Sequence, residues 1–209
     1  MARADSKQHG QILEAAIAVF GEHGRQGATI RLVGRRAGVN SALIYYYFEN
    51  KETLFAEAIR HVLRGFLEHL QTRRRPLRGA RDRLGWLVDG VFAYYSAHPD
   101  RMRLMAIALS LHPALFGRTL TRFLPGRALI PLDVLAEGMA RGELRRAPPF
   151  DAWWSILGLC LFSLLLQPAV RHLSPPRPRP PALSLTGRRD QIVELLVRGL
   201  TATERKPPR

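Results

Sequence analysis

The sequence predicts an all-α fold, on three observations. Apolar residues recur at helical spacing in almost every segment; Leu13, Ala16, Ile17 and Phe20, for example, fall at i, i+3, i+4 and i+7. Prolines stand at the joints between such segments, where a helix has to end or restart. Alternating β-branched runs bounded by hairpin turns are missing. Helices packed on helices are therefore the expected architecture.

Composition narrows the class of protein. With 209 residues, of which 46% are hydrophobic and 23% charged, the chain can build one large core or two small ones. A single cysteine excludes an internal disulfide, and the first 25 residues show no signal-peptide pattern, so we expect a cytoplasmic protein. The net charge of +15 favours a polyanionic partner. Because that charge is spread along the chain, a solvated basic surface explains it equally well.

The helices follow in chain order. The first carries the stripe described above and meets a stop signal at Gly24, and the helix of residues 50–70 opens at Asn50 as its N-cap. Later helices are predicted at about 80–97, 100–110, 114–124, 127–141, 151–167 and 187–200. Five prolines within residues 174–181 cannot be helical, so the segment 174–186 is expected to be a Pro/Arg-rich loop.

The segment 152–170 contains no charged residue. Its apolar run covers 15 residues before Gln167-Pro168, whereas a membrane span needs about 20. A helix buried in a core or in a dimer interface is the favoured interpretation, and no membrane partner is expected. A peripheral membrane protein that uses this run together with the arginines stays open as an alternative.

The segment 29–48 has the pattern of a helix-turn-helix. Thr29 can cap a short helix, Gly38 stands where a tight turn requires positive φ, and Asn40 can cap a second short helix that ends at Phe48. A second helix of this kind fits the major groove of DNA.

This part of the chain resembles the DNA-binding domain of the tetracycline-repressor (TetR) family. The resemblance rests on EAAIAVFGEHG at 14–24, AGVNSALIYYYF at 37–48 and NKETLF at 50–55. It implies a three-helix DNA-binding domain at 1–52 and a helical effector-binding and dimerisation domain at 53–209. It also implies double-stranded operator DNA as the partner and a small molecule that releases the protein from it.

Transferred by position, the resemblance assigns two phosphate contacts, Thr29 and Lys51. The recognition helix would present Asn40, Ser41, Ala42, Tyr45 and Tyr46 to DNA. Arg31 is a further candidate from its place in the motif, although a merely solvated arginine is an equally good interpretation. Tyr47 is expected in the core, because three adjacent aromatic residues cannot all point outward from one helix. Tyr47 and Ala42 also depart from the histidine and glycine common in the family.

Large soft side chains are frequent between residues 80 and 170, and a cavity among them would suit a hydrophobic or aromatic effector. The candidates are Trp86, Phe92, Tyr95, Met102, Met105, Phe123 and Trp153. For each of them a filled core is the plainer alternative, and only the resemblance implies a pocket.

Two apolar stripes need to be covered, and the resemblance implies that a second copy of the chain covers them in a homodimer. They comprise Trp154, Leu157, Gly158, Leu161 and Leu165 on one helix, and Ile192, Leu195, Leu196 and Gly199 on the last. A terminal helix must cover its stripe with its own domain or with another subunit, and the resemblance favours the subunit, in a two-fold four-helix contact.

No sequence pattern predicts catalysis. Phosphate-binding glycine loops, a His-Glu-x-x-His pair and cysteine or histidine clusters at metal spacing are all missing. We therefore expect no catalytic residues, metal or cofactor. The favoured function is a dimeric DNA-binding transcriptional repressor with a small effector. The alternative is a helical-bundle enzyme or carrier of small molecules without specific DNA binding.

Overall fold

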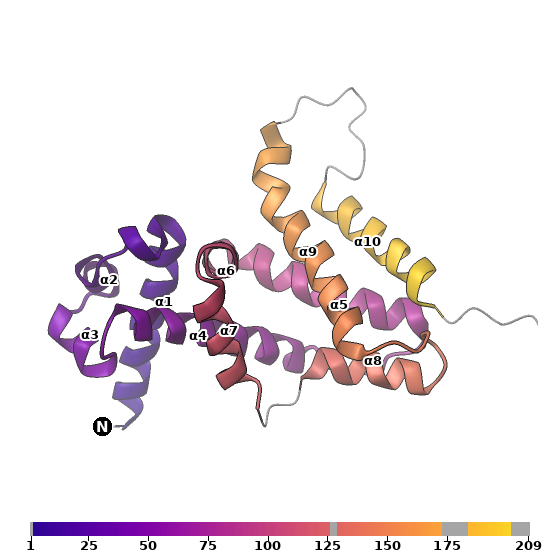
Figure 1. Cartoon of the computed structure of the whole chain (residues 1–209), viewed down its shortest axis with the longest axis horizontal. Helices are drawn as coiled ribbons and strands as arrows, with labels where there is room; N and C mark the ends of the chain where they lie inside the picture. Colours follow the sequence, from indigo (N-terminus) through magenta and orange to yellow (C-terminus); the bar gives the residue numbers. More distant parts are fainter. Residues whose placement is uncertain (1, 126–128, 173–183, 202–209) are drawn as a thin grey trace, which may run out of the picture. The chain divides into compact units, whose positions relative to one another are not determined.

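A computed structural model describes residues 2–125, 129–172 and 184–201 (Figure 1). Within these ranges the regular structure is helical, and the one β-type pairing is an isolated bridge between Leu144 and Thr201. The predicted all-α fold is confirmed. The helices are α1 (Ala2–Gly27), α2 (Ile30–Ala37), α3 (Ser41–Tyr47), α4 (Lys51–Thr72), α5 (Gly79–Ala97), α6 (Pro99–Leu111), α7 (Pro113–Phe123), α8 (Ile130–Ala140), α9 (Pro149–His172) and α10 (Leu185–Leu200).

Most helix ends lie where the local signals place them. Gly24 leaves the helical conformation at φ +66°, and α1 resumes beyond it for one short turn. The exception is α9, which was expected to stop at 167 but continues through Pro168 to His172. Proline keeps a helical φ and removes only one hydrogen bond so close to the end, so the last turn persists. Of the expected loop 174–186, residues 174–183 lie outside the described ranges, and Ser184 already caps α10.

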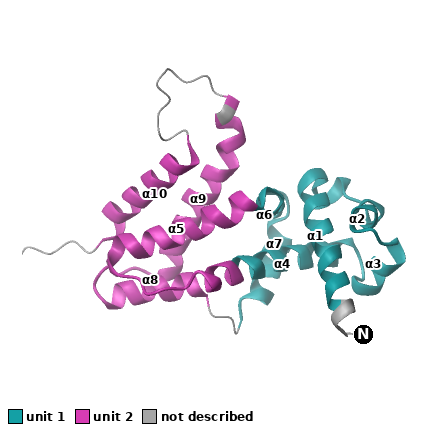
Figure 2. Cartoon of the chain, turned by 180° about the vertical axis from the view of Figure 1, so that it is seen from behind, with its two compact units in different colours: residues 1–66, 98–127 teal, residues 67–97, 128–209 magenta. Residues whose placement is uncertain are grey.

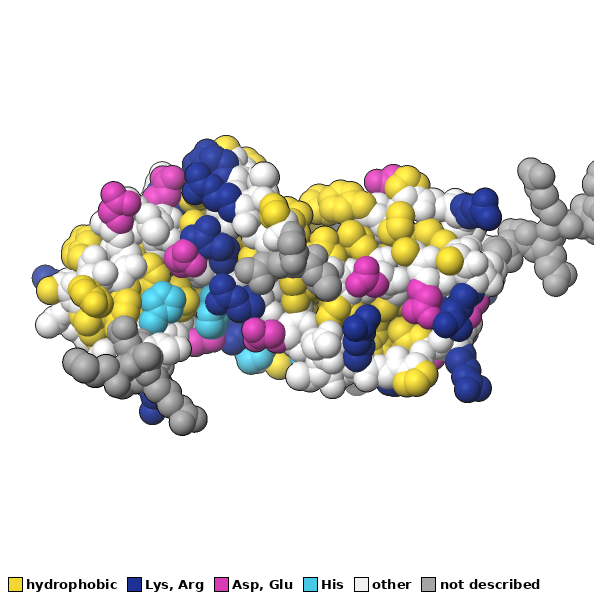
Figure 3. Space-filling view, turned by 90° about the horizontal axis from the view of Figure 1, so that it is seen from below, with side chains coloured by type: hydrophobic (Ala, Val, Ile, Leu, Met, Phe, Trp, Pro, Cys, Tyr) yellow, Lys and Arg dark blue, Asp and Glu magenta, His cyan; other side chains and the backbone are white. Residues whose placement is uncertain are grey.

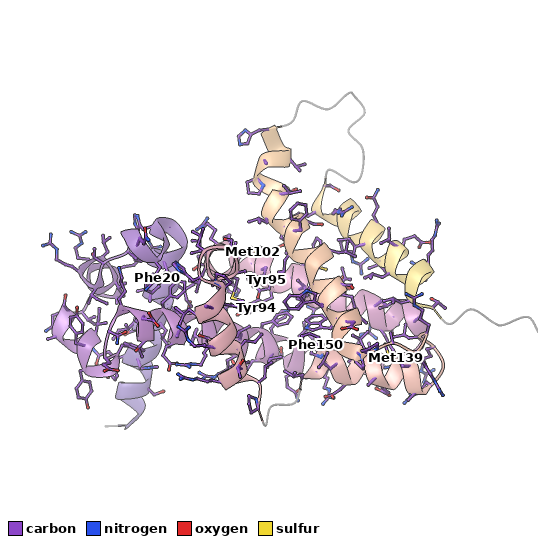
Figure 4. All side chains as sticks on the ribbon, viewed as in Figure 1. Phe20, Tyr94, Tyr95, Met102, Met139 and Phe150 are labelled. Atoms are coloured by element: carbon purple, nitrogen blue, oxygen red, sulfur yellow. The ribbon has the colours of Figure 1, made fainter. Side chains whose placement is uncertain are left out.

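The chain divides into two compact units (Figure 2). Unit 1 comprises residues 1–66 and 98–127. In it α6 packs along α1, α2 packs against α1 and α3 against α2, around a core in which the Phe20 and Phe55 rings meet edge to face at 4.9 Å. The label on Phe20 in Figure 4 marks the α1 side of this core.

Unit 2 comprises residues 67–97 and 128–209, and α5 is its central helix. Helices α8, α9 and α10 all pack against α5, and α9 also contacts α8 and α10. The guanidinium of Arg83 on α5 is 1% exposed and donates to Glu143 at 2.5 Å, to Glu137 at 3.2 Å and to the Leu77 carbonyl at 3.3 Å. Three separate segments are tied to α5 through this one side chain.

The compact units do not follow the expected division after residue 52. Unit 1 takes in α4 as far as Phe66 together with α6 and α7. The apolar side of α4, with Leu54, Phe55 and Ile59, is fully buried in that unit. A helix that supplies core residues packs as part of the core that it fills, so a boundary within the first turn of α4 does not coincide with the boundary between the compact units.

Candidate nucleic-acid interface

Two side-chain caps and a glycine build the helix-turn-helix of unit 1. Thr29 Oγ1 accepts a hydrogen bond from the Leu32 amide at 3.1 Å and begins α2, and Asn40 Oδ1 accepts from the Leu43 amide at 2.8 Å and begins α3. Gly38 lies between them in the left-handed region at φ +68°. Each of these three features was predicted from the local sequence, because capping and φ preference act within a few residues.

A second glycine controls how closely the turn approaches α2, and the sequence interpretation missed it. A Cβ on Gly34 would lie 2.8 Å from the Val39 carbonyl oxygen, which is too close for any side chain. The Val39 amide in turn donates to the Gly34 carbonyl at 2.9 Å. The backbone of α2 and the first residues of the turn are therefore in direct contact, which sets where α3 begins.

Helix α3 has one buried and one exposed side. Ile44 and Phe48 are buried in unit 1, whereas Tyr45 and Tyr46 are 54% and 76% exposed. Ala42 is exposed and Ser41 half-buried at the start of the helix. Two large aromatic rings in solvent are unusual for a residue type that normally buries most of its surface. The exposed side of α3 therefore presents two aromatic side chains to solvent.

Tyr47 is half-buried, so its expected core role is met only in part, and its ring meets the neighbouring Tyr46 ring edge to face with centroids 5.1 Å apart. Its ring meets His9 of α1 edge to face at 5.5 Å, and the Phe48 ring stacks on the same imidazole at 5.0 Å. His9 had not been singled out from the sequence, since no local signal connects it to residues almost 40 positions away.

The ammonium group of Lys51, which was predicted to contact a DNA phosphate, is hydrogen-bonded within the protein. Its half-buried Nζ donates to the Ala28 carbonyl at 3.1 Å and to the Gln26 carbonyl at 3.5 Å. These carbonyls belong to the segment that leads into Thr29. The lysine therefore joins the first residue of α4 to the start of α2 and sets its charge beside the two helix N-termini.

The surface of the motif is basic. Residues 25–51 contain five Arg or Lys and one Glu, a net charge of +4. Arg31 and Arg35 are exposed and, within the described part of the chain, make no ion pair, whereas Arg36 pairs with Glu22 of α1 at 3.0 Å. On the face in Figure 3 basic side chains appear on both units with acidic and apolar ones among them, so charge alone does not mark the motif.

The predicted effector residues are divided between the two compact units. Trp86, Phe92 and Tyr95 are buried in unit 2, where Trp153 is half-buried, but Met102, Met105 and Phe123 are buried in unit 1. Within unit 2, Trp86 lines a cavity of about 330 Å³ and Phe92 another of about 380 Å³. Periodicity showed that these side chains are buried, but it could not show which of them share a cavity.

The two predicted dimer stripes are only partly exposed. On α9, Trp154, Gly158 and Leu165 are exposed, while Leu157 and Leu161 are half-buried. Phe150, Phe162 and Leu166 add to this exposed face, although they were not predicted, and Phe150 stacks on Trp154 with ring centroids 5.9 Å apart.

On α10 the stripe is divided. Leu195 is 61% exposed and Gly199 is exposed, but Ile192 and Leu196 are 2% and 5% exposed within their own unit. Assigning those last two to the contact between subunits was wrong, because α5 and α9 pack against α10 and already cover them.

Helix α9 is long and apolar enough over Pro149–Val170 to cross a membrane, and only 11% of its apolar stretch is buried. The sequence predicted a helix too short for a membrane span. That prediction was wrong, because the helix begins before residue 152 and continues past Pro168. Helices α6 and α7 are long and apolar enough for a membrane span only when taken together, and they are bent by 114° at the break between them. Among the described side chains, no three His, Cys, Asp or Glu residues are placed to hold a metal ion.

Comparison with known proteins agrees with this arrangement. The family model for bacterial regulatory proteins of the tetR family matches residues 12–58. The chain is 33% identical over 155 residues to the HTH-type transcriptional repressor NicS of Pseudomonas putida, covering 72% of this chain and 73% of that relative. It is 23% identical over 135 residues to the fatty acid metabolism regulator protein of Bacillus subtilis, covering 65% and 70% of the two chains.

Solved structures share the fold. The fatty acid degradation regulator FadR of Bacillus halodurans superposes with a TM-score of 0.72 at 21% identity, over 91% of this chain and 94% of that one. FadR of Bacillus subtilis, solved with stearoyl-CoA, gives 0.72 at 20% identity, over 91% and 98%. The curated relatives are named as regulators or repressors, not as enzymes. From the capped helix-turn-helix, the matching family model and the extended similarity to NicS together, this chain belongs to the TetR family of bacterial transcriptional regulators.

Proposed function

We propose that the chain is a dimeric repressor that binds operator DNA through α3 and responds to a small-molecule effector. The observation that carries the proposal is α3 itself: its N-terminus is capped by Asn40, Ile44 anchors one side, and Tyr45 and Tyr46 project from the other. In this proposal residues 1–52 supply DNA binding, and residues 53–209 supply effector binding and dimerisation. The protein acts in the cytoplasm, where its operator is.

The contacts divide into two kinds. Asn40, Ser41, Ala42, Tyr45 and Tyr46 lie on α3 or at its start, where base edges and the adjoining backbone are reached together. Thr29, Arg31 and Lys51 lie at or beside the N-termini of α2 and α4, where backbone amides and positive charge attract phosphate. Because Lys51 also holds the segment before Thr29, its loss would weaken DNA binding through position as well as charge.

Selection of bound sites from random DNA tests the regulator function, and a palindromic or near-palindromic motif is the expected result, since a two-fold dimer reads two half-sites. Arg31→Gln should weaken binding to every sequence alike. It should also lower the slope of log affinity against log salt by about one unit. Arg146→Gln, an exposed arginine of unit 2, is the matched control. If no motif is enriched, the protein is not a sequence-specific regulator.

For the dimer, we propose the exposed apolar face of α9 with the exposed part of α10. The proposal is supported by the exposure of several large apolar side chains, because such side chains are seldom left together in water. They are Trp154, Phe162 and Leu165 on α9 and Leu195 on α10. Leu195→Asp places a carboxylate in that contact, where an unpaired buried charge costs several kcal/mol. Sedimentation at micromolar concentration should give a dimer for the parent and a monomer for the variant.

Leu111→Asp is the control, because Leu111 is equally exposed but lies at the end of α6 in unit 1. A monomeric parent, or loss of the dimer in the control alone, would contradict the interface. Flotation with liposomes separates the remaining alternative: a protein whose α9 face is covered by a second copy stays at the bottom of the gradient, whereas a membrane-bound one floats.

The effector we propose is small and hydrophobic or aromatic, in line with the stearoyl-CoA found in FadR of Bacillus subtilis. Such a compound releases the operator only by binding the DNA-free form more tightly, and DNA must then weaken the compound by the same factor. Titrating a tryptophan-quenching compound with and without saturating operator measures that coupling. A compound with equal affinity in both titrations is not the effector.

A further inference from the structure

A cavity of about 330 Å³ in unit 2 has an unusual lining. The segment between α4 and α5 contributes Arg74, Arg75, Pro76, Leu77 and Arg78, α5 contributes Trp86, and α8 with the residue after it contributes Asp133, Val134, Glu137 and Arg141. Four arginines from two separate segments thus surround one hollow, and its volume is within the range of small-molecule sites.

Not all of these arginines are engaged inside the protein. Arg75 pairs with Asp82 at 2.5 Å, and Arg141 pairs with Glu137 at 2.7 Å. Among the described residues, the guanidiniums of Arg74 and Arg78 have no acidic partner, and both side chains are exposed. Glu137 is committed to Arg83 as well, at 3.2 Å, so much of its charge is already neutralised. The lining therefore keeps two free planar cations.

Part of the lining is apolar and fixed. Val134 is buried, and Trp86 is 4% exposed with its Nε1 donating to the Arg73 carbonyl at 3.0 Å. That bond and the packing around it hold the indole still, and they also hold the backbone just before Arg74. Leu77 and Pro76 complete the apolar part from the connecting segment. A lining that combines fixed apolar residues with free guanidiniums suits a ligand with an apolar body and an anionic end.

We propose that this cavity binds a small organic phosphate, a phosphate monoester with an aromatic or apolar body. Guanidinium groups donate paired hydrogen bonds to phosphate oxygens, and a phosphate monoester brings close to two negative charges and three acceptor oxygens to two guanidiniums, where a carboxylate brings one charge and two oxygens. The body then covers Val134 and the edge of Trp86. Asp133 opposes the anion, so it is a specificity element that excludes ligands with charge along their whole length.

This ligand class would be the effector of the proposed repressor. The role of the ligand as an effector rests on the proposed function, whereas its binding to the cavity does not. Binding is measured on the full chain by calorimetry, without DNA, at fixed ionic strength. Phenyl phosphate should bind about tenfold more tightly than inorganic phosphate, benzoate or benzyl alcohol, because each of these lacks one of the two parts.

Two variants test the residues. Arg74→Gln with Arg78→Gln should lower phenyl phosphate affinity about tenfold or more, since both free cations are removed. The matched control is Arg145→Gln with Arg146→Gln, which removes the same charge from exposed arginines that do not line the cavity and should change affinity less than about twofold. Asp133→Asn should strengthen binding.

Three results would overturn the inference: inorganic phosphate or benzoate as strong as phenyl phosphate, an unaffected Arg74/Arg78 variant, or an equal loss in the control. The last would mean diffuse attraction to a basic surface. The selection of operator sites is a separate measurement. A failure of phosphate binding therefore leaves the regulator function standing, and a failure of operator binding leaves the cavity testable.

Discussion

Alanine at position 34 tests whether the contact between α2 and the turn sets the DNA-binding motif. Its Cβ would lie 2.8 Å from the Val39 carbonyl oxygen and 3.6 Å from Ile44 Cδ1. A carbon and an oxygen in close contact lie about 3.3–3.6 Å apart, so the carbonyl has to move by about half an ångström or more. That carbonyl belongs to the turn backbone and cannot rotate away as the end of a flexible side chain could.

The expected magnitude follows from two opposing terms. Overpacking of this kind costs about 1–3 kcal/mol, while alanine gains about 0.5–1 kcal/mol over glycine inside a helix. The middles of these two ranges differ by about 1 kcal/mol, which is the expected net loss of unfolding free energy for Gly34→Ala. For a chain of this length that lowers the melting temperature by roughly 2–4 °C. The shift is measured by circular dichroism at one protein concentration, because the proposed dimer would make the melting temperature depend on concentration.

Gly117→Ala is the control. Gly117 is exposed within α7, and its Cβ would meet nothing within 4 Å, so the same substitution should stabilise by about 0.5–1 kcal/mol. Operator affinity should fall for Gly34→Ala, because α3 is displaced, and stay unchanged for the control. If Gly34→Ala melts at or above the parent temperature, the close approach does not position α3 and the reasoning fails.

Further experiments test the cap of α3, the buried Arg83 and three titrating groups. Asn40→Ala removes the cap of α3 and should cost about 1 kcal/mol in urea unfolding. Glu143→Gln should destabilise by about 1–2 kcal/mol at pH 7, because it leaves Arg83 with one carboxylate fewer. The Arg83 hydrogen bond lowers the pKa of Glu143 below 4.5, so this difference should disappear as pH falls through that lowered value. Burial lowers the pKa of His112 below 6.5, so the parent loses stability as pH falls below 6.5, and His112→Gln should reduce that loss. Burial raises the pKa of Cys160 to about 12, so a thiol reagent at pH 8 should modify it only after unfolding.

Features that depend on near neighbours could be predicted from the sequence. The caps at Thr29 and Asn40 and the turn at Gly38 appear in the structure as expected, because hydrogen bonding to the next few amides and the φ preference of glycine are local properties. Helical periodicity likewise located the ten described helices with errors of a few residues at their ends. The side of α3 that Tyr45 and Tyr46 occupy follows from the same periodicity.

Features that depend on residues distant in the sequence could not be predicted from it. Lys51 contacts carbonyls 23 and 25 positions earlier, and Gly34 is constrained by the chain that folds back over it. Trp86 and Phe92 look alike in sequence but line different cavities, and the arginines beside Trp86 became a candidate site only once the segment before α5 and the end of α8 met.

By itself, the sequence determined the helical class, the helix-turn-helix and the family to which it belongs. The tertiary structure decided which apolar residues are covered within the chain and which stay exposed on α9 and α10. The physical reason is that periodicity assigns a residue to one side of a helix, but burial depends on what packs against that side. Ile192 and Leu195 show the difference within one predicted stripe, because α10 turns the first toward its own unit and the second toward solvent.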